Sequence, residues 1–153
     1  MGPTHRNAEM GSLGRVFEDL LVGVPLFSNL SRRNLSRLAK SGNDVTYSIG
    51  TKLTGAGEKG ICFFVIAEGE ARVEVKGQEV RRLGPGDYFG EMALIDRSQS
   101  SATVTATTDM RCFVMTQWNF RPFATEHPDV AWALLEAMVQ RVREAEGRTP
   151  SDG

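Results

Sequence analysis

The sequence has few of the residues that build metal and catalytic centres. Its 153 residues include only two histidines, His5 and His127, and only two cysteines, Cys62 and Cys112. Two histidines so far apart in the chain exclude the histidine cluster of a metal-dependent β-roll enzyme. No Ser-His-Asp or Cys-His set has a workable arrangement either. We therefore expect no metal site and no enzymatic activity.

Long apolar runs and an excess of one charge are also missing. The longest apolar run covers seven residues, 61–67, whereas a membrane span needs about 20. Residues 1–9 lack the apolar region of a signal peptide. Eighteen Lys and Arg balance nineteen Asp and Glu, so the chain lacks the excess of positive charge that would attract nucleic acid. We expect a cytoplasmic protein without membrane insertion or nucleic-acid partner, and its cysteines, which lie in apolar runs, to be packed rather than disulfide-bonded.

Length and composition indicate one folded domain. The chain is 41% hydrophobic and 24% charged, values close to globular averages. Residues 1–11 have no hydrophobic periodicity, and we expect a flexible leader there; whether it is native stays open. The domain is expected over residues 12–146, and a flexible polar tail over residues 147–153.

Helices are predicted at both ends of the domain. Apolar residues recur at three- and four-residue spacing after Ser12, which predicts a helix that ends near Gly23. Ser31 is placed to cap a helix over residues 32–40, and Thr116 a helix over residues 117–125. Pro128 suits the first position of a long last helix that reaches Glu146. The apolar stripe expected on that helix comprises Val130, Ala131, Leu134, Leu135, Met138, Val139 and Val142.

Between residues 44 and 116 the pattern changes to that of short strands. Runs such as ICFFVIA, ARVEV, ATVTA and RCFVM are separated by Gly, Pro, Asp or Ser at intervals of roughly ten residues. Lys76-Gly77-Gln78 suits a hairpin tip. The expected fold class is α+β and mainly β: an antiparallel β-roll or jelly roll flanked by N-terminal helices and by two C-terminal helices.

The most informative segment joins a turn to a short helix. Gly90 permits a close backbone approach or a conformation that other residues avoid, and Glu91-Met92-Ala93-Leu94 has the composition of one helical turn. Free amides at the start of that turn suit a phosphate. The Glu91 carboxylate needs donors beside such a site, and ribose hydroxyls are donors. Together these features indicate a nucleotide.

These residues also carry a resemblance to a known family. The motif FGEMALI followed by SATV, with the lead-in LGPGDYFGE, resembles the phosphate-binding cassette of cyclic nucleotide-binding domains. The resemblance extends over residues 24–146. It implies a sensor domain that binds a cyclic nucleotide, moves its last helix on binding and acts on an effector that the sequence does not identify. Cyclic AMP is the first candidate ligand and cyclic GMP the second, and the base preference stays open. The resemblance implies these ligand-binding residues: Phe89, Gly90, Glu91, Met92, Ala93, Arg97, Ser100 and Ser101.

By this resemblance, Gly90 and Ala93 would offer backbone amides to the phosphate, and Glu91 would hold the ribose 2′-hydroxyl. One position departs from the family pattern, because Ser100 stands where the phosphate-pairing arginine is expected. An arginine would supply a charge-assisted bond about twice as strong as a neutral one. Three interpretations stay open: Ser100 and Ser101 hold the phosphate more weakly, Arg97 swings in, or the domain is degenerate and acts as a protein interaction module.

Overall fold

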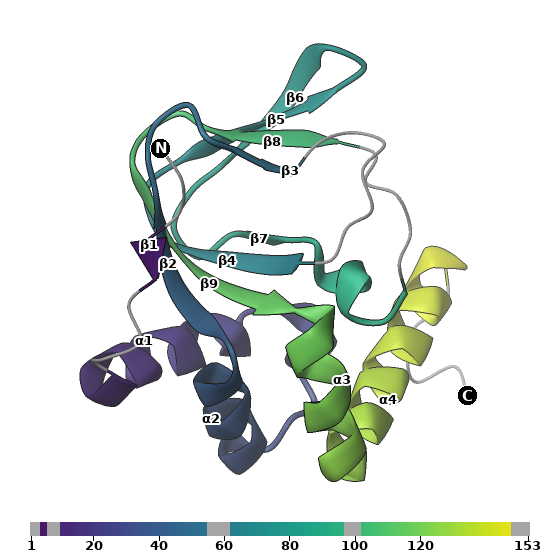
Figure 1. Ribbon diagram of the computed structural model, residues 1–153. Coiled ribbons are helices and arrows are strands. Elements are labelled where there is room, and N and C mark those ends of the chain that lie inside the picture. The colour runs from purple at the N-terminus through teal and green to yellow at the C-terminus, as the bar shows by residue number, and fades with distance from the viewer. Residues whose placement is uncertain (1–3, 6–9, 55–61, 97–101, 148–153) are drawn as a thin grey trace.

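The computed structural model describes residues 4–5, 10–54, 62–96 and 102–147. Two antiparallel sheets face each other in a β-roll, and the helices lie together on one side of it (Figure 1). One sheet has the strand order β1-β2-β9-β4-β7 and the other β3-β8-β5-β6. The expected α+β roll with flanking helices is confirmed.

The element bounds match most of the sequence predictions. The helices are α1 (Met10–Val22), η1 (Pro25–Phe27), α2 (Arg32–Ser41), η2 (Glu91–Leu94), α3 (Gln117–Glu126) and α4 (Pro128–Ala145). The strands are β1 (Thr4–His5), β2 (Asn43–Tyr47), β3 (Lys52–Thr54), β4 (Cys62–Glu68), β5 (Ala71–Val75), β6 (Gln78–Leu83), β7 (Tyr88–Phe89), β8 (Thr103–Ala106) and β9 (Met110–Thr116).

Local chemistry sets the helix starts and the hairpin as predicted. The Ser31 hydroxyl accepts a hydrogen bond from the Asn34 amide, and the Thr116 hydroxyl accepts one from the Asn119 amide, both at 3.2 Å. Lys76 and Gly77 both have positive φ at the hairpin tip, which is the requirement of a type I′ turn.

Three strands and part of the leader depart from the predictions. The leader was expected to lack structure, but Thr4 and His5 form β1 and pair with β2, and α1 begins at Met10. The short strands β3 and β7 were also not predicted; with two or three residues each, they are too short for an alternation pattern to appear. The rest of the predicted tail, residues 148–153, lies outside the described residues.

The core consists of two clusters separated by the larger sheet. Phe63 and Val65 of β4 pack with the helices, while Phe64 and Ile66 of the same strand lie among residues inside the roll. Because both faces of β4 are buried, its sequence is continuously apolar rather than alternating. β4 and the helical layer thus hold β7 and η2, which together carry the FGEMAL motif, at one end of the roll (Figure 1).

Candidate functional site

A tight turn brings the chain into the candidate site. The Gly84 amide donates to the Asp87 carboxylate at 2.8 Å, and Gly86 has a φ of +89°. The Gly86 amide donates to the Ile66 carbonyl at 2.8 Å, and the Ile66 amide donates to the Asp87 carbonyl at 2.9 Å. These bonds attach the turn to β4, so β7 begins at a defined place on the sheet.

Phe89 enters the roll from β7. Its ring stacks on Phe64 with 4.6 Å between the ring centroids, and Tyr47 lies next to Phe64 at 6.2 Å. Phe89 is partly buried against the interior cluster. The Phe89 ring therefore packs inside the roll, and the backbone that follows it lies at the end of the roll.

Gly90 has the special conformation that the sequence predicted. Its φ is +81°, and a Cβ atom placed on it would collide with the backbone carbonyl of Cys62. Both the left-handed backbone and the close approach require glycine. Gly90 therefore joins β7 directly to η2, and Leu94 at the end of η2 is buried in the helical cluster.

Glu91 lies within electrostatic reach of Arg141 on the last helix, α4. Burial raises the pKa of the Glu91 carboxyl above its usual value, and the positive charge of Arg141 opposes that rise. The pKa of the neighbouring Tyr88 is also raised, mainly by burial and then by the charge of Glu91. The positive charges of Arg141 and Arg81 only partly offset that rise. Arg141 therefore lies within electrostatic reach of both β7 and η2.

Glu91 and Arg141 are not satisfied by one another. Among the described residues, no hydrogen bond or ion pair joins them, and the Arg141 Nη1 atom is buried without a hydrogen-bond partner. A buried donor without a partner costs about 1–3 kcal/mol. A ligand with hydroxyl donors for the carboxylate and an acceptor for the guanidinium would relieve both groups.

The structure brings together the predicted residues from the first half of the motif. Phe89, Gly90, Glu91, Met92 and Ala93 follow one another through β7 and η2. The Met92 side chain is 37% exposed. The predicted residues Arg97, Ser100 and Ser101 lie outside the described residues.

Sequence reasoning missed Arg141. Arg141 is one of several polar residues in the last part of α4, with Gln140, Arg143 and Glu144. No spacing in the sequence distinguishes Arg141 from Arg143 as a partner for Glu91, because the pairing depends on how α4 lies against η2. That placement is a tertiary property.

The thiols are placed to pack rather than to react. Both Cys62 and Cys112 are free, and Cys112 is buried. Burial raises the pKa of Cys112 to about 12 and also raises the pKa of Cys62, and a protonated thiol is a poor nucleophile. Within the described ranges, no group of three or more His, Cys, Asp or Glu side chains is arranged to hold a metal ion.

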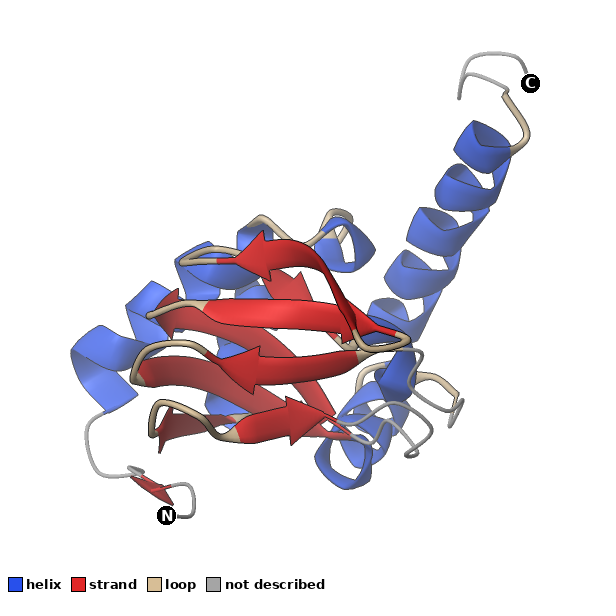
Figure 2. Cartoon of the chain, turned by 90° about the horizontal axis from the view of Figure 1, so that it is seen from above, coloured by secondary structure: helices blue, strands red, loops and turns tan. Residues whose placement is uncertain are grey.

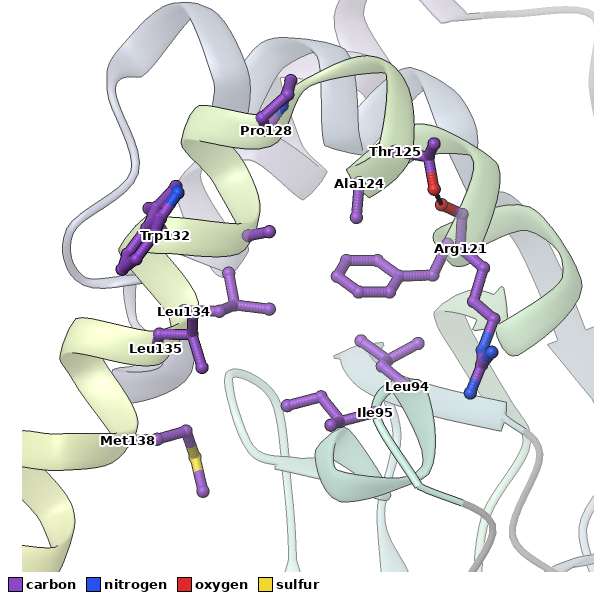
Figure 3. Close-up of a pocket in the computed structure, with 12 residues that line it drawn as sticks. Leu94, Ile95, Arg121, Ala124, Thr125, Pro128, Trp132, Leu134, Leu135 and Met138 are labelled. Atoms are coloured by element: carbon purple, nitrogen blue, oxygen red, sulfur yellow. Dashed lines mark hydrogen bonds between the residues drawn. The ribbon is translucent and has the colours of Figure 1, made fainter.

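An apolar pocket of about 750 Å³ lies beside the site, between η2, α3 and α4. Leu134 and Met138 of α4 face Leu94 and Ile95 of the η2 end across it (Figure 3). Trp132 and Leu135 lie at its α4 edge. The pocket adjoins the region that carries Glu91, so movement of η2 against α4 would change its shape.

One stripe of α4 differs from the sequence prediction. Val130 and Leu134 are buried as expected, but Leu135, Val139 and Val142 are exposed, and the buried face also includes Ala133 and Ala137. The apolar stripe seen in the sequence is therefore divided between a buried side and an exposed side of the helix. The helix has apolar residues on two sides, and only its packing against η1 and α3 selects the inner one.

None of the described helices is long and apolar enough to cross a membrane.

Known proteins show the same sequence pattern and fold. A cAMP-dependent protein kinase regulatory subunit from Mycosarcoma maydis is 40% identical over 108 residues, which are 66% of this chain and 21% of the relative. The N-terminal domain of a transcriptional regulator from Streptomyces coelicolor A3(2) has a TM-score of 0.77 and 29% identity, covering 90% of this chain and 99% of that one. The Thermus thermophilus catabolite activator protein has a TM-score of 0.64 and 28% identity, covering 80% and 60%.

This chain spans about a fifth of the length of the kinase regulatory subunit. The family model described as cyclic nucleotide-binding domain matches residues 44–127, which form more than half of the chain. That segment runs from β2 to the end of α3 and includes the turn, Gly90 and Glu91. The protein therefore belongs to the cyclic nucleotide-binding domain family.

Proposed function

We propose that this chain is a regulatory domain that binds a cyclic nucleotide, with cyclic AMP preferred over cyclic GMP, and that it binds its ligand without catalysis. The observation that carries the proposal is a buried Arg141 donor that has no hydrogen-bond partner among the described residues and lies within electrostatic reach of Glu91. Glu91 is partly buried with a raised pKa, and Arg141 has a buried donor without a partner. Relatives named as cAMP-dependent protein kinase regulatory subunits support the choice of ligand.

The two groups complement different parts of such a ligand. The Glu91 carboxylate accepts hydrogen bonds from the ribose 2′-hydroxyl, and ribose donors offset the cost of its burial. The backbone amides of Gly90 and Ala93 face the cyclic phosphate. Ser100 and Ser101 contribute neutral hydroxyls there.

Arg141 supplies positive charge to a site whose motif has Ser100 in place of arginine. The charge of Arg141 lowers the pKa of both Tyr88 and Glu91, which supports a position of this side chain close to β7 and η2. A guanidinium group that bonds an anionic or ribose oxygen forms a charge-assisted bond. In this proposal the cation that holds the ligand comes from α4 rather than from the motif itself.

A cation on α4 also couples binding to movement of that helix. α3 and α4 meet at His127, whose backbone is neither helical nor extended. Ligand that draws Arg141 toward Glu91 would favour one orientation of α4 about this junction and so shift a two-state equilibrium. An effector domain or protein would respond to that orientation. Both cysteines are free thiols, which fits a location in the reducing cytoplasm.

Isothermal titration of the chain with cyclic AMP and with cyclic GMP tests binding, with 5′-AMP as the matched linear control. We expect saturable heat with the cyclic nucleotides, stronger for cyclic AMP, and much weaker heat with 5′-AMP. No heat at millimolar cyclic nucleotide would overturn the proposal and favour the protein interaction module instead.

Hydrogen–deuterium exchange tests the coupling separately. We expect amides of α4 and of the α3–α4 junction to change protection when saturating cyclic AMP is added. Binding without any change in α4 would retain the sensor and remove the proposed movement.

A further inference from the structure

The apolar pocket between η2, α3 and α4 is not used by the proposed nucleotide site. Its volume is about 750 Å³, which is within the range of small-molecule sites. The sequence creates this space in two ways. His127 alone separates α3 from α4, and the two helices diverge from that junction (Figures 2 and 3). The residues that line the space include the small Ala124 and Ala131, whose side chains leave it unfilled.

The pocket has a buried floor and an exposed apolar rim. Leu94, Phe120 and Leu134 line the floor and are at most 4% exposed. The lining also contains three large apolar residues that are 44%, 66% and 54% exposed, namely Ile95, Trp132 and Leu135. Large apolar side chains that gather at one opening on the surface mark a binding site, whereas single scattered ones do not. A ligand that covered this rim would remove apolar surface from water.

Arg121 gives the pocket a positive charge. It is the only charged residue among the described residues that line the pocket, and its side chain extends from α3 toward η2 (Figure 3). Within the described part of the chain, no ion pair or hydrogen bond holds its guanidinium group. The Thr125 hydroxyl bonds only the Arg121 backbone, by donating to its carbonyl at 2.8 Å. The pocket therefore combines an apolar interior with a cation at its edge.

We propose that this pocket binds a carboxylic acid with an apolar body, of the fatty-acid or aromatic-acid kind. The apolar body occupies the space between Leu94 and Leu134, and the carboxylate pairs with the Arg121 guanidinium at the rim. Two N–H groups of a guanidinium can donate to the two oxygens of one carboxylate. A neutral molecule lacks this bond, and a cation is repelled. We expect a dissociation constant on the order of 0.1–1 mM.

This site is separate from the proposed nucleotide site. Glu91 and Arg141 are not among the residues that line the pocket, and the carboxylic acid needs neither of them. A chain that binds no cyclic nucleotide would therefore still bind the acid, and the failure of either proposal leaves the other in place.

Calorimetric titration with octanoate and with 2-naphthoate tests the binding and distinguishes a fatty acid from an aromatic acid. Octanamide and 2-naphthamide are the matched neutral controls. We expect saturable binding of at least one acid and weaker binding of its amide, by roughly fivefold or more. No binding of either acid at several millimolar would overturn the proposal. Equal affinity for acid and amide would overturn the pairing with Arg121.

Two variants test the residues that the proposal uses. Arg121→Gln should weaken binding of the acid roughly five- to tenfold, whereas Arg33→Gln, at an exposed position of α2 outside the pocket, should not. Ala131→Phe places a ring in the pocket and should weaken binding at least tenfold. Its control is Gln140→Phe, at an exposed position of α4 outside the pocket. Circular dichroism confirms that the variants are folded. Native affinity in Arg121→Gln or Ala131→Phe would contradict the proposed site.

Methionine-methyl NMR locates the bound acid in the native chain and depends on no variant that alters the pocket. Met138 lines the pocket, whereas Met110 is buried inside the roll. Both signals are assigned beforehand from Met138→Leu and Met110→Leu spectra. We expect the acid that binds to shift the Met138 methyl signal and to leave the Met110 signal unchanged. Saturable binding without a change at Met138 would overturn the placement of the acid in this pocket.

Discussion

Two carboxylate–arginine pairs of this protein differ in how completely their hydrogen-bonding groups are paired with each other. Arg111 of β9 donates to both oxygens of Asp44 at 2.9 and 2.7 Å, and Asp44 is 1% exposed. Arg111 also donates to Glu68 at 3.2 Å. Glu91 and Arg141 lie within electrostatic reach, but no hydrogen bond joins them in the described structure.

The difference separates a structural ion pair from the pair that we propose binds the ligand. The bond to Asp44 raises the pKa of Arg111, so each group stabilises the charge of the other. At the other pair, burial raises the pKa of Glu91, and the charge of Arg141 and a hydrogen bond from the Glu91 backbone only partly offset that rise. A paired network adds stability or specificity to the fold, whereas an unpaired one is available to a ligand.

The largest effect is expected when the satisfied pair is broken. Asp44→Ala leaves Arg111 without its bidentate partner and should lower the free energy of unfolding by roughly 3–5 kcal/mol. Chemical denaturation measures the loss. Glu68→Ala is the control, because the Glu68 side chain is 67% exposed, and it should cost less than about 1 kcal/mol. Equal losses in the two variants would contradict the structural role of Asp44.

A substitution of Arg141 should have the opposite effect, because it should reduce ligand affinity and leave stability nearly unchanged. Among the described residues no hydrogen bond or ion pair holds the Arg141 side chain, and its Nη1 atom is without a partner, so Arg141→Gln should change the free energy of unfolding by less than about 0.5 kcal/mol. Cyclic AMP should bind roughly 10–100-fold more weakly, because a hydrogen bond to a charged group contributes about 1.5–3 kcal/mol. Calorimetric titration measures the affinity.

Arg143→Gln is the matched control for this prediction. It removes the same charge two residues further along α4, at a position that does not act on Glu91, and its affinity should stay native. If both variants bind equally well, Arg141 does not contact the ligand. If Arg141→Gln unfolds the domain, the two carboxylate–arginine pairs do not differ as described.

The smallest effect is expected in the pH dependence of stability that Glu91 produces. The pKa of Glu91 is higher in the folded state than in the unfolded chain, where it lies near about 4.3. The folded state therefore binds the proton more tightly, and the stability from this group is present at low pH and is lost as pH rises through the raised pKa. Glu91→Gln should gain stability relative to the native chain over that rise, as measured by denaturation at a series of pH values.

Nucleotide affinity should have the opposite slope. Ribose hydroxyls need the carboxylate form as acceptor, so affinity should increase as pH rises through the Glu91 pKa, and Glu91→Gln should remove this dependence. An identical pH profile in the two proteins would mean that Glu91 is only a helix-start carboxylate that the amides of η2 stabilise.

Much of the fold follows from short-range chemistry. Ser31 and Thr116 cap helices because a hydroxyl there meets a free amide three residues later. Gly90 was identified because its place between a strand and a helical turn requires a backbone that other residues avoid. The β4 run was identifiable as a strand, although its apolar residues alone do not reveal that both faces are covered.

The candidate site was only half predictable. Phe89 to Ala93 are consecutive, so one motif reveals them together. Arg141 is separated from Glu91 by 50 residues of chain, and its role depends on the angle at which α4 crosses η2. Leu135, Val139 and Val142 of α4 are exposed but were grouped with its buried residues for the same reason, because a helix with apolar residues on two sides does not reveal which side its domain will cover.

The sequence by itself determined the roll, its caps, the Gly90 turn and the family, since each depends on residues close together in the chain or on a recurring motif. Only the tertiary structure decided which arginine faces Glu91, which carboxylate is already paired and which face of α4 is left open. Those are properties of surfaces that meet across long separations in the chain, and they are settled by packing rather than by local preference.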